Sequence, residues 1–216
     1  LQNVPRALAV FICMFGMSLF FVGKATVGVI GDFYADPYLI KLEKFVHFGD
    51  IPNSLIPDGF YTHSIVSLSS KIYLFWFSIK FFFFFYAILF EKSKLLAAQV
   101  VWSYFLCWTV LGVACAFLLS SAGPLFLDLK YPELAEIYQP FLDKFIGLQE
   151  ANNTKYYFMG AKDSMGGAWL SRDLLGKFTI SAMPSLHIAI AWINVLQARR
   201  IHPFLGIATF IYAMVI

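Results

Sequence analysis

Five long apolar segments constrain the fold of this 216-residue chain more than any other feature. A membrane-spanning helix needs about 20 mainly apolar residues, and each of the first four segments can cross a bilayer. In lipid, backbone N–H and C=O groups must be satisfied within the spanning structure, and these lengths suit helices rather than barrel strands. We therefore predict an all-α fold, a polytopic membrane helix bundle. The segments are residues 7–23, 72–90, 95–122, about 178–198, and 204–216.

The composition agrees with a membrane protein and argues against several other classes. Only 13% of the chain is charged, and a soluble domain would carry about twice that fraction. The net charge of +3 is modest, and no zinc-finger or helix-turn-helix pattern is present, so nucleic acid is not an expected partner. The three cysteines lie inside apolar segments without ligand-like spacing, and we expect them to be small buried hydrophobes.

The two ends of the sequence indicate a piece of a longer protein. No initiator Met is present, and the fifth apolar segment is still running at Ile216. We expect one membrane-embedded domain over residues 1–216, truncated at its C-terminal end. The complete bundle is expected to have six transmembrane helices, of which about five fall within this sequence. The oligomeric state is left open.

Positive charge in the short connections predicts the orientation. Residues 91–94 and 199–203 join consecutive segments, Arg6 precedes the first, and all three lie on the same side of an alternating topology. Lys and Arg in short loops favour the cytoplasmic side. The long loops, 24–71 and 123–177, are then expected to face the periplasm, the exterior or a lumen, together with the start of the fourth segment.

The outward loops carry helical patterns of their own. Asp36-Pro37 is typical of an N-cap followed by a first-turn proline, and an amphipathic stretch follows. We expect this short helix to lie on the bilayer surface, with packing on the bundle as the alternative. A similar pattern over residues 134–145 is interrupted by Pro140, and the Gly-rich stretch 160–167 is expected to be a loop.

The seven residues Ser181-Ala-Met-Pro-Ser-Leu-His187 stand at the mouth of the fourth segment. A helix N-terminus offers unpaired N–H groups and a partial positive charge, so it favours phosphate. We expect Pro184 at the first helical position. Ser185 can add a hydroxyl donor, and His187 can supply a proton near neutral pH. This arrangement predicts phosphoryl chemistry at a membrane surface.

The same seven residues resemble the second signature motif of the type 2 phosphatidic acid phosphatase superfamily, whose core is Pro-Ser-x-His. The longer form found in residues 181–187 is most similar to the branch that includes inositol phosphorylceramide synthase. Ser120-Ser-Ala-Gly-Pro124 resembles that branch's small-residue and proline turn, and residues 24–52 look like its pre-core region. The resemblance covers most of the chain, and its specific part is residues 181–187.

The resemblance implies a lipid phosphatase or a phospho-head-group transferase (an inositolphosphotransferase-like enzyme) that needs no metal or other cofactor. In the family's mechanism, a histidine of a later motif attacks phosphorus and forms a phosphohistidine. Carried over, His187 is the general acid and Ser185 binds phosphate, with Ser181, Arg172 and Lys177 as further candidate phosphate ligands. The implied substrate is a phospholipid or sphingolipid. Water and a lipid hydroxyl both stay open as the acceptor, and the motif slightly favours transfer.

The chain departs from the family pattern at two motifs. The first motif, Lys-x6-Arg-Pro, is absent, so the cationic ligands are open between Lys130, Arg172 and Lys177, each of which is alternatively a solvated surface charge. The third motif, with the nucleophilic His and its Asp, is also absent. His202 cannot replace it, because Gly206 occupies the Asp position. We expect the missing pair beyond residue 216.

Other readings stay open beside the catalytic one. A histidine at the start of a membrane helix can be a plain interfacial residue, and Lys80 within the second segment can handle substrate or merely snorkel. His47 and His63 have no partner at ligand spacing, and we expect structural roles for them. The rival from another class is a non-catalytic membrane component that binds or transports a lipid or phosphate.

Overall fold

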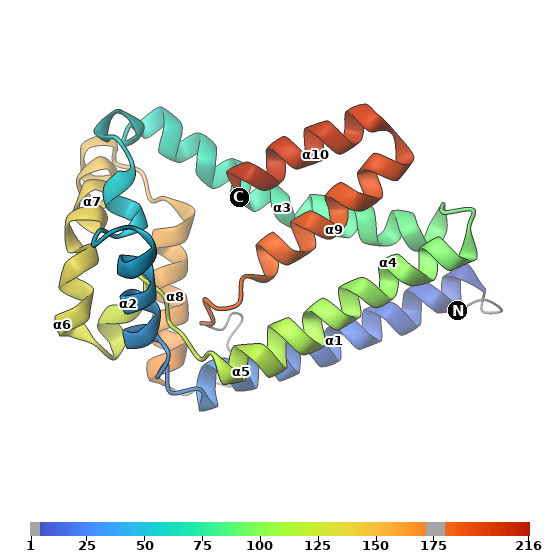
Figure 1. The fold of residues 1–216 in the computed structure, drawn as a ribbon, viewed down its shortest axis with the longest axis horizontal. Helices are drawn as coiled ribbons and strands as arrows, with labels where there is room; N and C mark the ends of the chain where they lie inside the picture. Colours follow the sequence, from blue (N-terminus) through green and yellow to red (C-terminus); the bar gives the residue numbers. More distant parts are fainter. Residues whose placement is uncertain (1–4, 172–179) are drawn as a thin grey trace. The chain divides into compact units, whose positions relative to one another are not determined.

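The computed structural model describes residues 5–171 and 180–216, and in these ranges the regular structure is helical throughout (Figure 1). The predicted all-α class is therefore confirmed. Three helical stretches are long and apolar enough to cross a membrane, Arg6–Val27, His63–Leu89 and Lys94–Leu118, and Pro203–Val215 is a shorter apolar helix. This set is consistent with a multi-pass membrane protein.

The chain forms two compact units, which are described separately. Unit 1 comprises the described residues of 5–24, 72–115 and 184–216, and unit 2 those of 25–71, 116–171 and 180–183. Two of the long helices pass from one unit to the other. They are α1 (Arg6–Ile30) and α3 (His63–Leu89).

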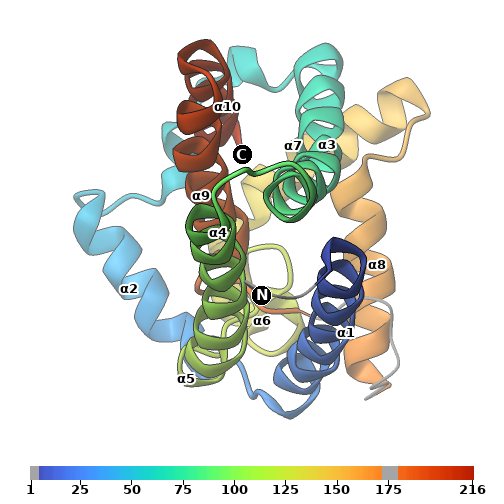
Figure 2. The same ribbon diagram turned by 90° about the vertical axis from the view of Figure 1, so that its right-hand side faces the viewer.

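Unit 1 is built on apolar helix faces that enclose an aromatic core. α4 (Lys94–Leu106) continues into a π-helical segment (Cys107–Cys115), which precedes the short α5 (Ala116–Leu118) in unit 2. α9 (Leu186–Ile201) packs on α4 and on the π-helical segment, and α10 (Pro203–Val215) folds back along α9 (Figure 2). The buried core includes Trp76, Phe84, Tyr104, Trp108 and Ile190.

A single residue separates α9 from α10. His202 adopts an extended conformation, and its Nδ1 accepts a hydrogen bond from the N–H of Phe204 at 3.2 Å. Pro203 follows as the first residue of α10, where a proline needs no hydrogen-bond donor. His202 is therefore the N-cap of α10.

The fourth apolar segment is helical over a different range from the one predicted. The apolar segment was given as about 178–198 with the helix start at Pro184, but 180–185 are not helical and α9 begins at Leu186, while 178–179 lie outside the described residues. Ser185 is the N-cap, and its Oγ accepts from the N–H of Ile188 at 3.5 Å. The placement of Pro184 at the first helical position was therefore wrong. A proline also disfavours helical geometry in the residue before it, here Met183.

Unit 2 consists of short helices and turns around two small apolar clusters. The larger helices are α2 (Asp36–Val46), α7 (Gln139–Asn152) and α8 (Tyr157–Leu170). The shorter ones are Pro52–Leu55, Asp58–Phe60, Leu127–Leu129, α6 (Pro132–Ala135) and Glu136–Tyr138. The interrupted pattern around Pro140 thus becomes a break before α7. The predicted amphipathic helix forms as α2, with Tyr38 and Phe45 71% and 82% exposed.

The Gly-rich stretch 160–167 was predicted to be a loop, and this prediction was wrong. It lies within α8, where Met165 and Trp169 pack against a cluster that contains Phe33 and Phe126. Two ion pairs also hold the helix, because Lys162 bonds Asp128 at 2.9 Å and Lys155 bonds Asp163 at 2.5 Å. Tertiary packing has here overridden the low helix propensity of glycine.

Candidate functional site

His187 is the second residue of α9, and two aromatic side chains of α3 fix its ring. Its Nε2 lies 2.9 Å from the hydroxyl of Tyr73, and the two ring centroids are 5.0 Å apart. The Trp76 ring is closer still, with its centroid 4.2 Å from that of the imidazole. A neutral imidazole has one donor and one acceptor nitrogen, so Tyr73 can either donate to Nε2 or accept from it. The ring is thus held with one nitrogen in use.

Lys80 lies one turn further along α3 and is almost fully buried, at 5% exposed. Its Nζ sits over the rings of Trp76, Phe77 and Phe81, at 4.4, 4.9 and 4.5 Å from their centroids. No carboxylate in the described ranges pairs with it. Helical side chains lean toward the helix N-terminus, so the ammonium reaches back toward the level of His187. The Trp76 ring therefore contacts both the ammonium and the imidazole.

Lys24, on α1, is a second partly buried lysine of unit 1. The Lys80 ammonium, which shares the Trp76 ring with His187, brings positive charge to the start of α9. The partial positive charge of the helix N-terminus adds to it. An anion is the natural complement of this region.

A glycine on the π-helical segment allows α9 to begin close to its neighbours. A Cβ added at Gly112 would lie 2.8 Å from Cδ1 of Leu186 and 2.7 Å from the Phe20 ring. Real Cβ atoms essentially never come that near another heavy atom, so any larger residue would displace one of the two side chains. Leu186 directly precedes His187, and Gly112 thus helps to set the position of the histidine.

Unit 2 contains a second polar centre, built around the carboxylate of Asp36. This side chain is 3% exposed and accepts three hydrogen bonds, from Ser121 Oγ at 2.6 Å and from the N–H groups of Ala122 and Gly123 at 2.8 and 3.1 Å. The N-cap of α2 is Ala35. The prediction of Asp36 as N-cap was therefore wrong, because its carboxylate bonds a distant turn instead of its own helix.

The same turn holds the first residues of the Ser181–His187 motif. The N–H of Ala182 donates to the carbonyl of Ser121 at 2.9 Å. Gly123 has a φ of 75°, and a Cβ there would lie 2.7 Å from the Cβ of Ala182, so both backbone conformation and close approach require glycine. Three stretches that resemble the family thus meet in unit 2. They lie around residues 36, 120–124 and 181–182.

The residues predicted as site residues have different surroundings in the structure. His187 and Ser185 belong to unit 1, whereas Ser181 belongs to unit 2, where its buried Oγ has no hydrogen-bond partner among the described residues. Arg172 and Lys177 lie outside the described residues.

The other polar candidates in the outward loops are engaged in unit 2. Lys130 pairs with Asp32 at 2.6 Å. His47 bonds the carbonyl of Glu43 through Nδ1 at 2.8 Å, and Nδ1 of His63 lies 3.0 Å from the hydroxyl of Tyr156.

Sequence reasoning missed Tyr73, Trp76 and Lys24, and it left Lys80 undecided. A signal for three of these residues was present, because Tyr73, Trp76 and Lys80 are spaced by three and four residues and so share one face of a helix. Nothing in the sequence indicated that this face meets His187, which is 114 residues from Tyr73. No group of three or more His, Cys, Asp or Glu that could hold a metal ion occurs in the part of the chain that the structure describes.

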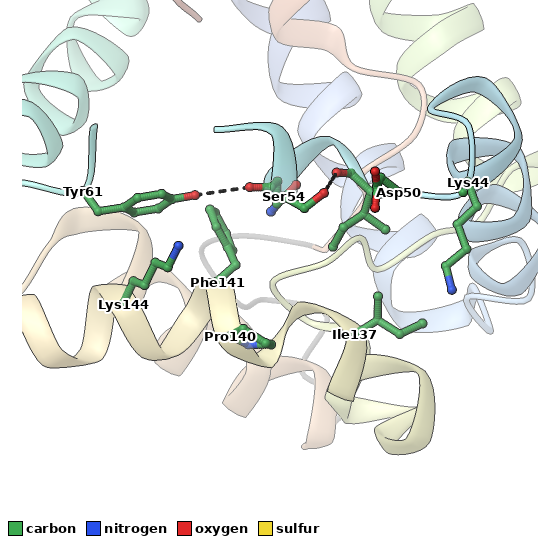
Figure 3. Close-up of a pocket in the computed structure, with 11 residues that line it drawn as sticks. Lys44, Asp50, Ser54, Tyr61, Ile137, Pro140, Phe141 and Lys144 are labelled. Atoms are coloured by element: carbon green, nitrogen blue, oxygen red, sulfur yellow. Dashed lines mark hydrogen bonds between the residues drawn. The ribbon is translucent and has the colours of Figure 1, made fainter. Parts of the chain in front are cut away.

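Unit 2 also has a cavity of about 380 Å³ (Figure 3). Asp50 and Ser54 line one side, and Pro140 and Phe141 of α7 lie opposite. Lys144 lines it too, but its ammonium is already paired with Asp58 at 2.6 Å. Of the predicted site residues that the structure describes, Ser181, Ser185 and His187 do not line this cavity.

Comparison with protein families gives a match to the PAP2 superfamily over residues 37–216, and the chain belongs to this superfamily. The match includes the Ser181–His187 motif, Tyr73, Trp76 and Lys80. Comparison with curated proteins and with solved structures gave no match. The superfamily that the motif resembles is thus confirmed. Membership indicates a phosphatase or phosphotransferase that acts on lipid phosphates.

Proposed function

We propose that this protein cleaves the phosphoester of a membrane lipid at the outer or lumenal face, with His187 as the general acid. The observation that carries the proposal is the setting of His187, which stands in the first turn of α9 with Nε2 held by Tyr73 and its ring against Trp76. A general acid must be fixed within reach of the leaving oxygen, and these contacts provide that restraint. Tyr73 is a positioning residue in this scheme.

Ser185 is placed to hold a phosphate oxygen. Its Oγ accepts from the N–H of Ile188, and this leaves the hydroxyl hydrogen free to donate outward. The first N–H groups of α9 have no partner within the helix and can donate to the same anion. The N-cap thus combines a structural role with a binding one.

The proposed reaction has two halves. A nucleophilic histidine, which the resemblance assigns to a later motif, forms a bond to phosphorus while the P–O bond to the leaving group breaks. The electron pair goes to the leaving oxygen, which takes a proton from His187. Water or a lipid hydroxyl then attacks phosphorus and gives its proton back to His187, and the histidine–phosphorus bond breaks.

We favour transfer of a phospho-head-group to a lipid hydroxyl, as in the inositol phosphorylceramide synthase-like branch. We also propose that one membrane domain carries out this reaction. The sequence of the motif supports this choice. So do the hydrogen bonds that join Asp36 and Ala182 to the turn at residues 121–123, because these stretches resemble that branch. Full-length protein in proteoliposomes can decide. Phosphate release from phosphatidic acid would indicate hydrolysis, whereas transfer from phosphatidylinositol to ceramide would indicate the synthase-like reaction.

His187→Ala is the direct test of the catalytic role. We expect it to lower turnover by about 10²- to 10⁴-fold, the usual contribution of a general acid, while the protein still inserts into the membrane. His47→Ala is the matched control, because that histidine bonds its own helix in unit 2. Normal turnover by His187→Ala would refute the proposal. Lipid binding without turnover in the wild-type protein would instead support the non-catalytic rival.

The orientation can be tested by cysteine labelling in sealed cells or vesicles. Ala151 is exposed near the end of α7, in an outward loop, and Lys92 is exposed in a connection that we place in the cytoplasm. We expect Ala151→Cys to react with an impermeant thiol reagent from outside, and Lys92→Cys to react only after lysis. The reverse pattern would place the start of α9 on the inner face.

A further inference from the structure

Buried hydrogen-bond donors that have no acceptor gather next to the His187 site. Trp76 and Asn194 are 4% and 2% exposed, and neither Trp76 Nε1 nor Asn194 Nδ2 has a partner among the described residues. Lys80, at 5% exposed, adds an ammonium that lies over three aromatic rings. Buried donors are nearly always satisfied in native proteins, so a cluster of unpaired ones needs an explanation.

These donors form one connected patch within unit 1. The Lys80 ammonium lies over the Trp76 ring. The hydroxyl of Tyr104 donates to the carbonyl of Lys80 at 3.2 Å and also to Oδ1 of Asn194, so α3 and α9 are joined at this level. Gln197, one turn further along α9, has an unpaired acceptor, Oε1, while its amide nitrogen donates to the carbonyl of Phe83. Donors therefore dominate on the side of the patch that is nearer to His187.

Trp76 and Lys80 of this patch lie in an apolar helix that can span a membrane, His63–Leu89. A charged side chain at this depth is costly and usually faces a partner or a pathway. No acidic side chain of the described residues supplies that partner for Lys80. The missing partner must bring several acceptor atoms and negative charge, and a phosphate group brings both.

We propose that the Lys80 ammonium and the Trp76 indole N–H bind phosphate oxygens of the lipid substrate beside His187. This rests on the proposed function and adds to it a phosphate site built from a membrane helix instead of from the outward loops. Of the loop cations considered from the sequence, Lys130 is paired with Asp32, whereas Arg172 and Lys177 lie outside the described residues. Lys80 and Trp76 lie on a membrane-spanning helix, so a ligand must bring its phosphate into the helix bundle to reach them. We therefore expect the site to bind a phosphoester attached to a membrane lipid more tightly than a soluble phosphate.

The test uses full-length protein in nanodiscs and two readouts, turnover and equilibrium binding of a non-hydrolysable lipid phosphonate. Lys80→Met keeps the length of the side chain and removes its charge, and Lys80→Arg keeps the charge. Lys71→Met is the matched control, because Lys71 is exposed on the same helix. We expect Lys80→Met to weaken phosphonate binding by about 10²-fold, the upper range for loss of one charged contact. Lys80→Arg is expected to retain part of the affinity, and Lys71→Met all of it.

Trp76→Phe provides a second variant if Lys80→Met does not fold. It keeps an aromatic ring against His187 and Lys80 and removes only the indole N–H, and we expect about tenfold weaker binding, typical of one hydrogen bond to a charged group. Thermal melting in nanodiscs establishes that each variant is folded. An effect on melting without an effect on binding would mean that the patch is only structural, and would overturn the proposal.

The outcomes separate this proposal from the proposed function. Normal phosphonate binding by both Lys80→Met and Trp76→Phe overturns the phosphate site, whatever happens to turnover in His187→Ala. Binding that depends on Lys80 in a wild-type protein without any turnover supports the site and refutes the enzyme. Inorganic phosphate is the third probe. If it competes as tightly as the lipid phosphonate, the selection for a membrane lipid is wrong.

Discussion

Two buried charges, one in each compact unit, have opposite surroundings. The Asp36 carboxylate in unit 2 accepts three hydrogen bonds from the turn at Ser121–Gly123. The Lys80 ammonium in unit 1 lies over three aromatic rings, and the indole N–H of its neighbour Trp76 has no acceptor among the described residues. A buried charge whose bonds are complete belongs to the framework, whereas one surrounded by spare donors is suited to a ligand. The comparison therefore distinguishes Asp36, which stabilises the fold, from Lys80, which we propose binds the substrate.

Removing the satisfied charge is expected to have the largest effect. Asp36→Ala leaves one hydroxyl and two N–H groups buried without an acceptor, at about 1–3 kcal/mol each. We expect the free energy of unfolding to fall by about 3–5 kcal/mol, measured by denaturant titration in detergent micelles. Asp32→Ala is the control, because Asp32 is 73% exposed and pairs with Lys130, and a surface pair contributes about 0–1 kcal/mol. Equal losses of unfolding free energy in Asp36→Ala and Asp32→Ala would mean that the buried carboxylate stabilises the fold no more than the exposed one.

The next effect concerns packing instead of charge. Gly112→Ala places a methyl group against Leu186 and Phe20, and such overpacking costs about 1–3 kcal/mol. Because Leu186 precedes His187, we also expect kcat to fall. Gly23→Ala in α1 serves as the comparison, since its nearest atom, on Val113, would be 3.4 Å away, an ordinary contact. If Gly112→Ala has wild-type melting and turnover, the close approach does not position α9.

The smallest effect has the opposite sign. Lys80→Met removes a buried charge that no carboxylate in the described ranges neutralises, and we expect it to stabilise the ligand-free protein by about 1 kcal/mol while substrate binding weakens. Lys71→Met should leave stability unchanged, because that side chain is exposed. A loss of stability in Lys80→Met would show that the aromatic cage satisfies the ammonium, and the two buried charges would then be alike.

Local chemistry made much of the fold predictable. An apolar run is visible in consecutive residues, so the membrane-spanning stretches in α1, α3 and α4 could be predicted directly from the sequence. The start of α3 was not, because this helix begins nine residues before its apolar run. The proline before an apolar run likewise placed His187 near a helix start, although α9 begins at Leu186, two residues after Pro184.

Contacts between distant parts of the chain were not predictable in this way. Asp36 and Ser121 are 85 residues apart, and α8 forms despite three glycines because of the cluster it packs on. Among the residues that surround His187, the spacing of Tyr73, Trp76 and Lys80 carried the one local trace of their contact with the site.

The geometry at Asp36 has an evolutionary consequence. Two of its three donors are backbone N–H groups, which are present whatever side chains stand at positions 122 and 123, except proline. Only the bond from Ser121 depends on a side chain. Among relatives, substitutions at position 121 should therefore be tolerated far more readily than substitutions at position 36. An aspartate one residue before the family match is expected to be the more nearly invariant of the two.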